Sequence, residues 1–332
     1  MIEKERKFEF RSVFAPYIEN YLQLKLSFGE KIAVPGTVLR LFDRYCIENN
    51  VLDTVLTNKL VDDWLASFEN EKASTHSSKI SVLRCFSRHM NSLGGIVRWE
   101  PKNGYTSHGS KYMPYIFSDN EIQKIFMAAD SLRENYGRTR FHKIFPVLLR
   151  VLYGTGLRVS EALKLKLKHV DLKNGTLTIE NAKFGKSRLL PISESLRSVL
   201  NDYYCRNSDY IGISEDNYFF PNPFGERYSQ RTVYDKFREV LWKSGIPHRG
   251  KGKGPRVHDL RHTFAVRALR QLVQSGKDTY VALTAIMVYL GHSRIGSTEY
   301  YLRLTANVFP DFLQKSDLVC GTAIPEEVKI DE

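Results

Sequence analysis

The chain has 332 residues, 42% of them hydrophobic and 26% charged, and a formal net charge of +12. This length predicts two domains, and the composition is typical of a globular protein. No run of eighteen apolar residues is present, and the charged N-terminus lacks the apolar core of a signal peptide, so we expect a cytoplasmic protein without a membrane span. The four cysteines show no CxxC spacing, so we expect neither a disulfide framework nor a zinc site.

The excess positive charge is concentrated in one part of the chain. Residues 111–320 carry 33 Lys and Arg against 20 Asp and Glu, whereas residues 1–110 carry 15 against 13. A basic surface attracts polyanions, and duplex DNA is the commonest one that needs a whole basic face. A basic surface that serves solubility alone would have the same composition, so charge does not separate the two interpretations.

Residues 1–100 show helical periodicity. Apolar side chains recur every three or four residues in four stretches, and Thr57 is placed to cap the third. The turn 35–37 is expected to open the second helix, and a Ser- and Thr-rich loop at 72–78 to precede the fourth. No strand signal competes, so we expect a bundle of four helices.

The fourth of these helices carries a set of basic side chains. Lys79, Arg84 and Arg88 recur at spacings that suit a DNA-facing surface. Solvated charge explains the same pattern equally well, so the two interpretations stay open.

A linker is expected at residues 101–117, which are rich in Gly, Ser, Pro and Asn and lack periodicity. A capping box formed by Ser118 and Glu121 then begins a second domain, 118–332. An apolar helix follows and ends in a glycine turn. Arg158 is expected to open a further helix that continues to about Val170.

The next segment gives the only good strand signal. Leu177 and Ile179 fit one strand, Leu189 and Leu190 fit a second, and residues 181–186 supply the turn. Helices are expected at 193–205 and 228–244. The basic loop that precedes His258 suits contact with a phosphate backbone through Arg249, Lys251 and Lys253.

The stretch from His258 to Tyr301 contains the residues best suited to catalysis. His258 and Arg261 lie on one face of a helix, and His262 is expected to point away by about 100°. An isolated pair of this kind more often caps a helix and forms a salt bridge. Likewise, lysines at a hairpin tip, such as Lys183 and Lys186, are usually only solvated.

The joint pattern is much more specific than its parts. Five motifs occur in a fixed order along the chain: GLRVSE, a hairpin lysine ahead of RLLP, HDLRHTFA, LGHS, and a tyrosine nine residues after the histidine of LGHS. Over residues 118–310, and weakly over 10–95, the sequence resembles the tyrosine recombinase (phage integrase-like) family, most closely its Xer-like bacterial and mobile-element members. The resemblance implies a mainly α fold with a small β-hairpin or sheet. It combines an N-terminal four-helix core-binding (SAM-like) domain with a mixed α/β catalytic domain.

The resemblance also implies roles for individual residues. Two arginines bind the phosphate, a hairpin lysine and two histidines assist, a tyrosine is the nucleophile and an acidic residue supports the site. These positions match Arg158, Arg261, Lys183, His258, His292, Tyr301 and Glu161 respectively. Spacing favours Tyr301 over Tyr300 as the nucleophile and Lys183 over Lys186 as the active-site lysine, leaving Lys186 to contact backbone phosphate.

The chemistry of phosphodiester cleavage suits these residue types. Arginine forks stabilise charge that builds on the non-bridging oxygens, and a tyrosine with a reference pKa of about 10 needs a proton acceptor, for which His258 is the better candidate. The product is a covalent 3′-phosphotyrosine that stores the bond energy, so neither metal nor another cofactor is expected.

The expected function is therefore site-specific recombination of double-stranded DNA. By the resemblance, a monomer or dimer would assemble on DNA into a homotetramer that works through a Holliday junction, with an accessory DNA-bending or directionality factor as a possible partner. The C-terminal tail offers Leu304, Val308, Phe309 and Phe312 for docking on its own or a neighbouring subunit. A type IB topoisomerase and a non-catalytic sequence-specific DNA-binding protein are the alternatives.

Overall fold

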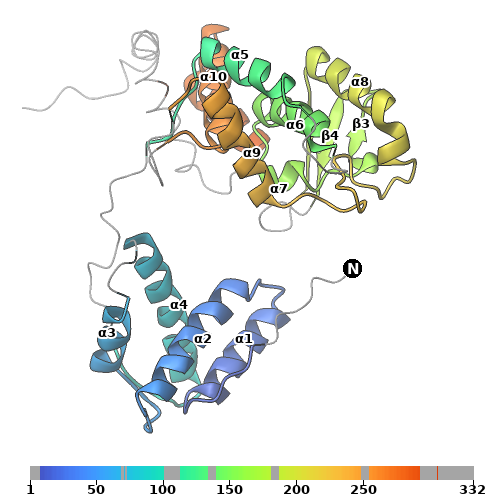
Figure 1. Ribbon diagram of the computed structural model, residues 1–332. Coiled ribbons are helices and arrows are strands. Elements are labelled where there is room, and N and C mark those ends of the chain that lie inside the picture. The colour runs from blue at the N-terminus through green and yellow to red at the C-terminus, as the bar shows by residue number, and fades with distance from the viewer. Residues whose placement is uncertain are drawn as a thin grey trace, which may run out of the picture. The chain divides into compact units, whose positions relative to one another are not determined.

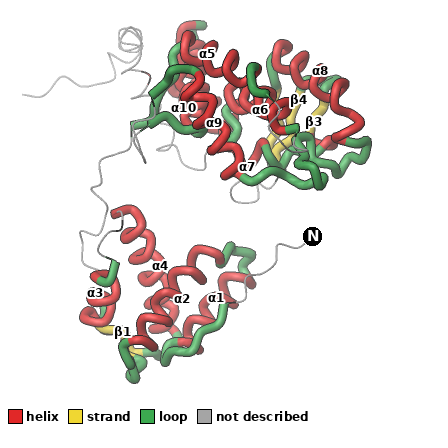
Figure 2. Tube along the Cα trace, viewed as in Figure 1, coloured by secondary structure: helices red, strands yellow, loops and turns green. Residues whose placement is uncertain are grey.

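The protein is described by a computed structural model that covers residues 8–68, 71, 73–100, 113–133, 140–180, 187–247, 254–291 and 305. The chain divides into two compact units, residues 1–112 and residues 113–332 (Figure 1). Figure 2 shows that helices make up most of the described chain and that the strands are short. Within the described ranges no helix is both long and apolar enough to cross a membrane.

The first unit contains four described helices, as the periodicity predicts: α1 (Ala15–Ser27), α2 (Ala33–Glu48), α3 (Asn58–Ala66) and α4 (Ala73–Ser92). Each turns an apolar face inward, and aromatic rings meet at the centre. The ring of Phe42 lies 5.4 Å from that of Phe14 and 5.4 Å from that of Trp64. The predicted cap of α3 is confirmed, because the Leu60 N–H donates to Thr57 Oγ1 at 3.2 Å.

Three local expectations for this unit are wrong. A short pair of parallel strands, β1 (Val55–Thr57) and β2 (Ile96–Arg98), was not predicted. Each strand has only three residues, and the two strands lie far apart in the sequence. Helix α4 begins at Ala73, inside the expected loop. Its serine hydroxyls bond back to helix carbonyls, as Ser78 does to Ser74 at 3.0 Å, and so do not interrupt the helix. Helix α2 begins at Ala33, because proline is tolerated in a first turn.

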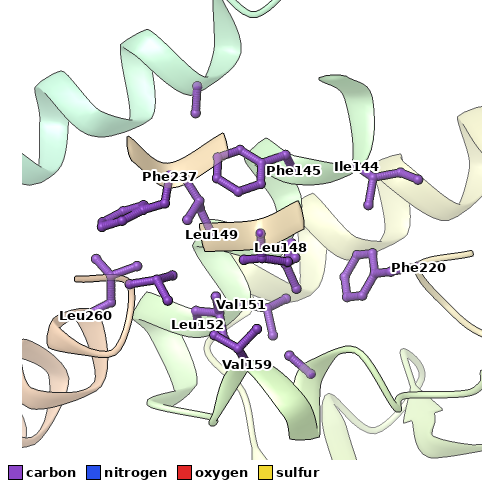
Figure 3. Close-up of a cluster of buried hydrophobic side chains, with 14 of the residues drawn as sticks. Ile144, Phe145, Leu148, Leu149, Val151, Leu152, Val159, Phe220, Phe237 and Leu260 are labelled. Carbon is purple, nitrogen blue, oxygen red and sulfur yellow. The ribbon is translucent and has the colours of Figure 1, made fainter. Parts of the chain in front are cut away.

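The second unit packs around an apolar central helix, α6 (Phe141–Thr155). Helix α6 contacts α5 (Asp119–Asp130), α8 (Glu194–Ile211) and α10 (Asp259–Gln274). Figure 3 shows Phe145, Leu148 and Leu152 of α6 in a cluster with Phe237 and Leu260. Helices α9 (Gln230–Lys243) and α11 (Thr279–Leu290) complete the set of described long helices, with α11 packed on α10.

A three-stranded antiparallel sheet lies beside these helices in the order β3 (Val170–Asp171), β4 (Thr176–Ile179), β5 (Arg188–Pro191). The predicted strand pair is confirmed, with Leu177 opposite Leu190. Its turn, 181–186, lies outside the described residues.

The helix expected from Arg158 to Val170 is much shorter. Helix α7 (Val159–Ala162) is followed by the 3-10 turn η1 (Leu167–His169). The backbone leaves the helix because it pairs with a distant segment: the Phe219 N–H donates to the Leu165 carbonyl at 2.8 Å. The predicted capping box is confirmed, since the Ser118 N–H donates to Glu121 Oε2 at 2.8 Å and the Glu121 N–H to Ser118 Oγ at 3.3 Å.

Candidate active site

Arg158 follows a tight turn that ends α6. Gly156 adopts a left-handed conformation with φ of 63°, and a Cβ at this position would lie 2.6 Å from Phe264 Cδ1. The chain therefore needs glycine here both for its backbone angle and for close packing. Two residues later, Arg158 caps α7, and its backbone N–H donates to Glu161 Oε2 at 3.0 Å.

Arg261 holds three segments of the second unit together. Its side chain is only 2% exposed, and Nη1 and Nη2 each lie 2.7 Å from a backbone carbonyl oxygen, of Gly156 and Leu290 respectively. A guanidinium is planar with fixed donor directions, so these two bonds set its orientation. The turn that carries Arg158, the start of α10 and the end of α11 are thereby fixed relative to one another.

Glu161 is the centre on which the arginines converge. Its carboxylate accepts from Arg158 Nη1 at 2.8 Å and from Arg188 Nη2 at 2.9 Å, and it lies 4.0 Å from Arg261 Nη1. Burial acts to raise the pKa of Glu161, but hydrogen bonds from Arg188 and from the Arg158 backbone outweigh it and lower that pKa. The described part of the site therefore combines the ionised Glu161 carboxylate with the guanidinium groups of Arg158, Arg188 and Arg261, and this excess of positive charge favours an anion as the occupant.

His258 is held neutral beside these arginines. Burial is the largest cause that lowers its pKa to about 4, followed by the charges of Arg261 and Arg158. A neutral imidazole at physiological pH can accept a proton. The expectation that His262 points away is wrong with respect to His258: the two rings lie 4.9 Å apart, edge to face, because residues four apart share a helix face.

Sequence reasoning did not single out Arg188. This side chain, 12% exposed, begins β5, donates from Nε to the Tyr289 carbonyl at 3.0 Å and forks onto Glu161. The available signal was its place in the RLLP segment after the basic turn. Spacing alone did not reveal that a strand residue would reach a helix that begins 29 positions earlier, at Val159.

Several expected site residues lie outside the described part of the chain. They are Lys183, Lys186, Arg249, Lys251, Lys253, His292, Tyr300 and Tyr301, together with the tail residues Leu304, Val308, Phe309 and Phe312. The structure brings together the described members Arg158, Glu161, His258 and Arg261.

In the first unit, the basic residues expected to face DNA differ in their exposure. The Lys79 side chain is 3% exposed, its ammonium lies 2.8 Å from a Glu71 carboxylate oxygen, and it stacks over the rings of Trp64 and Phe68. The expectation that Lys79 faces DNA is therefore wrong, because its ammonium group is buried and paired with Glu71 inside the unit. Arg84 is partly buried and Arg88 is exposed.

Comparison with known proteins decides the family. The model of the phage integrase family matches residues 116–307, a span that includes all six candidate catalytic positions. The chain belongs to the phage integrase family. This member is accordingly a site-specific tyrosine recombinase, an enzyme of DNA recombination.

Similar proteins support this assignment over most of the chain. A Sinorhizobium fredii relative named as an integrase/recombinase, y4rB, is 27% identical over 293 residues, covering 88% of this chain and 93% of that protein. The fold matches the XerH site-specific recombinase in its post-cleavage complex with a palindromic difH substrate, with a TM-score of 0.65 at 18% identity, covering 85% of this chain and 79% of that one. It also matches a lambda integrase tetramer bound to a Holliday junction, with a TM-score of 0.60 at 19% identity over 86% and 76% of the two chains.

Proposed function

We propose that this recombinase cleaves and rejoins double-stranded DNA through a covalent 3′-phosphotyrosyl intermediate on Tyr301. The observation that carries the proposal is the convergence of Arg158 and Arg261 on Glu161, with a neutral His258 beside them. A phosphodiester repels nucleophiles and has a poor leaving group. Oriented positive charges reduce the repulsion of the nucleophile, and a proton donor makes the leaving group a better one.

The first chemical step forms one bond and breaks another at the scissile phosphorus. The hydroxyl of Tyr301 attacks and His258 accepts its proton, while the bond to the 5′ oxygen breaks and Lys183 protonates that leaving group. Arg158 and Arg261 donate to the non-bridging oxygens as their charge grows, and His292 adds a further hydrogen bond. Rejoining reverses the step, with a 5′ hydroxyl of the partner duplex as the attacking group.

In this proposal both domains contact the DNA. Residues 1–100 form the core-binding domain, residues 101–117 the linker and residues 118–332 the catalytic domain. Exposed arginines such as Arg88, the basic loop with Arg249, Lys251 and Lys253, and Lys186 at the hairpin contact backbone phosphates. Phosphate contacts position a protein on DNA and make its affinity depend on salt.

Four protomers would then exchange two duplexes through a Holliday junction. The likeness to the lambda integrase tetramer on such a junction supports this assembly. The C-terminal tail would dock on a neighbouring subunit and connect the active sites, and a DNA-bending or directionality factor would assist. The biological task would be integration, excision or transposition of a mobile element, carried out in the cytoplasm.

A nicked suicide substrate tests the nucleophile directly. The protein is incubated with nicked DNA from sequences that flank its gene, and covalent adducts are separated on denaturing gels and sequenced. The Tyr301→Phe variant should bind the same DNA and form no adduct, whereas Tyr300→Phe should form it normally. An adduct from Tyr301→Phe would contradict the assignment of the nucleophile, and site-independent plasmid relaxation by a monomer would favour topoisomerase activity instead.

A further inference from the structure

Arg188 connects three elements that lead to candidate catalytic residues. It begins β5, the strand that follows the hairpin turn containing Lys183. Its Nε donates to the Tyr289 carbonyl at 3.0 Å, near the end of α11 and three residues before His292. Its Nη1 and Nη2 donate to the two carboxylate oxygens of Glu161 at 3.3 and 2.9 Å.

These bonds engage the whole guanidinium of Arg188 with groups of the protein itself. Every nitrogen of its guanidinium already has an acceptor within the protein, and the side chain is 12% exposed. Arg158, by contrast, is 28% exposed and donates to Glu161 through its side-chain Nη1. Arg188 is therefore placed to act on the site through its neighbours.

The neighbour that matters is Glu161, because this carboxylate and the scissile phosphate need the same arginine. Arg158 Nη1 lies 2.8 Å from Glu161 Oε1. A buried carboxylate without another partner would hold Arg158 strongly, since a charge in a poorly solvated place needs compensation. The fork from Arg188 supplies that compensation and weakens the competition for Arg158.

The end of α11 is built around the same side chain. Gly291 has a φ of 67°, and a Cβ added there would lie 2.8 Å from Arg188 Nη1 and 3.1 Å from Cζ. A glycine at this position thus satisfies the left-handed turn and leaves room for the guanidinium. The close approach ties the position of Arg188 to the turn that precedes His292.

We infer that Arg188 is a positioning residue for DNA cleavage: it neutralises Glu161 and so releases Arg158 to bind the scissile phosphate, while it ties β5 to the end of α11. This inference rests on the proposed phosphotyrosyl mechanism. It predicts that loss of Arg188 harms the cleavage step far more than DNA affinity. It also predicts that removing the charge of Glu161 relieves part of the harm.

The experiment compares Arg188→Met, Arg188→Lys and the double variant Arg188→Met with Glu161→Gln, in the full chain. DNA affinity is measured by fluorescence anisotropy, and the rate of adduct formation on the nicked substrate is measured at saturating protein. Arg188→Met should bind DNA as the unmodified protein does but cleave at least about tenfold more slowly, a loss typical of residues that orient active-site ligands. Arg206→Met, which removes an exposed charge on α8, is the matched control and should cleave normally.

The double variant carries the decisive readout. Glu161→Gln should raise the cleavage rate of Arg188→Met several-fold, because a neutral amide no longer retains Arg158. If the role of Arg188 is merely structural, any rescue follows recovered thermal stability, so an equal or lower rate in the double variant, or a gain in rate that only follows its thermal stability, overturns the inference. A cleavage rate for Arg188→Met equal to that of the unmodified protein, or a loss confined to DNA affinity, overturns it as well.

Two further comparisons distinguish a loss of folding from a loss of cleavage. Thermal unfolding is measured for each variant to show whether it folds. If Arg188→Met does not fold, Arg188→Lys keeps the charge without the fork and should cleave at an intermediate rate; a rate equal to that of the unmodified protein would contradict the inference. Absence of an adduct from the unmodified protein would refute the phosphotyrosyl mechanism itself, whereas the role of Arg188 is judged from ratios to that protein.

Discussion

Arg261 Nη1 lies 2.7 Å from the carbonyl oxygen of Gly156, a residue 105 positions earlier in the chain. This bond joins the two arginine-bearing segments of the site, because Arg158 follows Gly156 by two residues. A side chain proposed to bind the scissile phosphate thus also holds the turn that presents Arg158, the other arginine proposed for that role. We therefore expect substitutions of Arg261 to change stability and catalysis together.

Arg261→Lys should reduce both properties. A lysine has one nitrogen and cannot reach the carbonyls of Gly156 and Leu290 with the geometry of a fork, so at least one buried carbonyl loses its donor. We expect the free energy of unfolding to fall by about 1–3 kcal/mol in urea titrations. Adduct formation should fall by roughly 10² or more. Arg158→Lys is the control: its side chain is more exposed, and it should lose cleavage with a smaller loss of stability.

Gly156→Ala should destabilise the catalytic unit through its packing. The added Cβ would lie 2.6 Å from Phe264 and 2.9 Å from Leu290, and alanine is strained at a φ of 63°. The backbone conformation costs about 1–2 kcal/mol and the overpacking roughly 1–3 kcal/mol more. Gly245→Ala provides the matched control, since Gly245 has a φ of 70° and nothing within 4 Å of its added Cβ. Equal losses of unfolding free energy in the two variants would contradict a packing role for Gly156.

His258 should make stability fall in mild acid. Its pKa is about 4 in the folded chain, below the reference value near 6.5, so the unfolded chain binds more protons between these values. The stabilisation is complete above pH 6.5 and is lost as pH falls toward 4, by at most about 1.4 kcal/mol per pH unit. Urea unfolding of His258→Gln at pH 7.5 and pH 5 should show a shallower dependence than the unmodified protein. Identical slopes would show that His258 is not held neutral.

Arg88 and Lys79 should differ in their effect on DNA binding. Arg88→Ala removes an exposed charge and should lower the slope of log K against log salt by about 1. Lys79→Met should leave that slope unchanged and alter only thermal stability, because the Lys79 ammonium is buried against Glu71 and two aromatic rings. Anisotropy titrations at several salt concentrations measure both. A reduced slope for Lys79→Met would place this side chain at the DNA after all.

Features that depend on near neighbours could be predicted from the order of residues alone. The caps at Thr57 and Ser118 need only a side-chain oxygen and an N–H three residues away, so their spacing predicted them. The order of the motifs identified Arg158, His258 and Arg261 as members of one site by resemblance to the recombinase family. The strand pair of β4 and β5 followed from alternation and a nearby turn.

Contacts between distant groups could not be predicted in this way, because they depend on how the chain packs. Helix α7 is short because its continuation pairs with the backbone near Phe219, and Lys79 is buried because aromatic side chains of α3 and of the loop after it reach α4. The same holds for Arg188, whose position in the sequence reveals neither Glu161 nor Tyr289. Such contacts arise when packing brings remote segments together, and the need to compensate a buried charge then selects the partner.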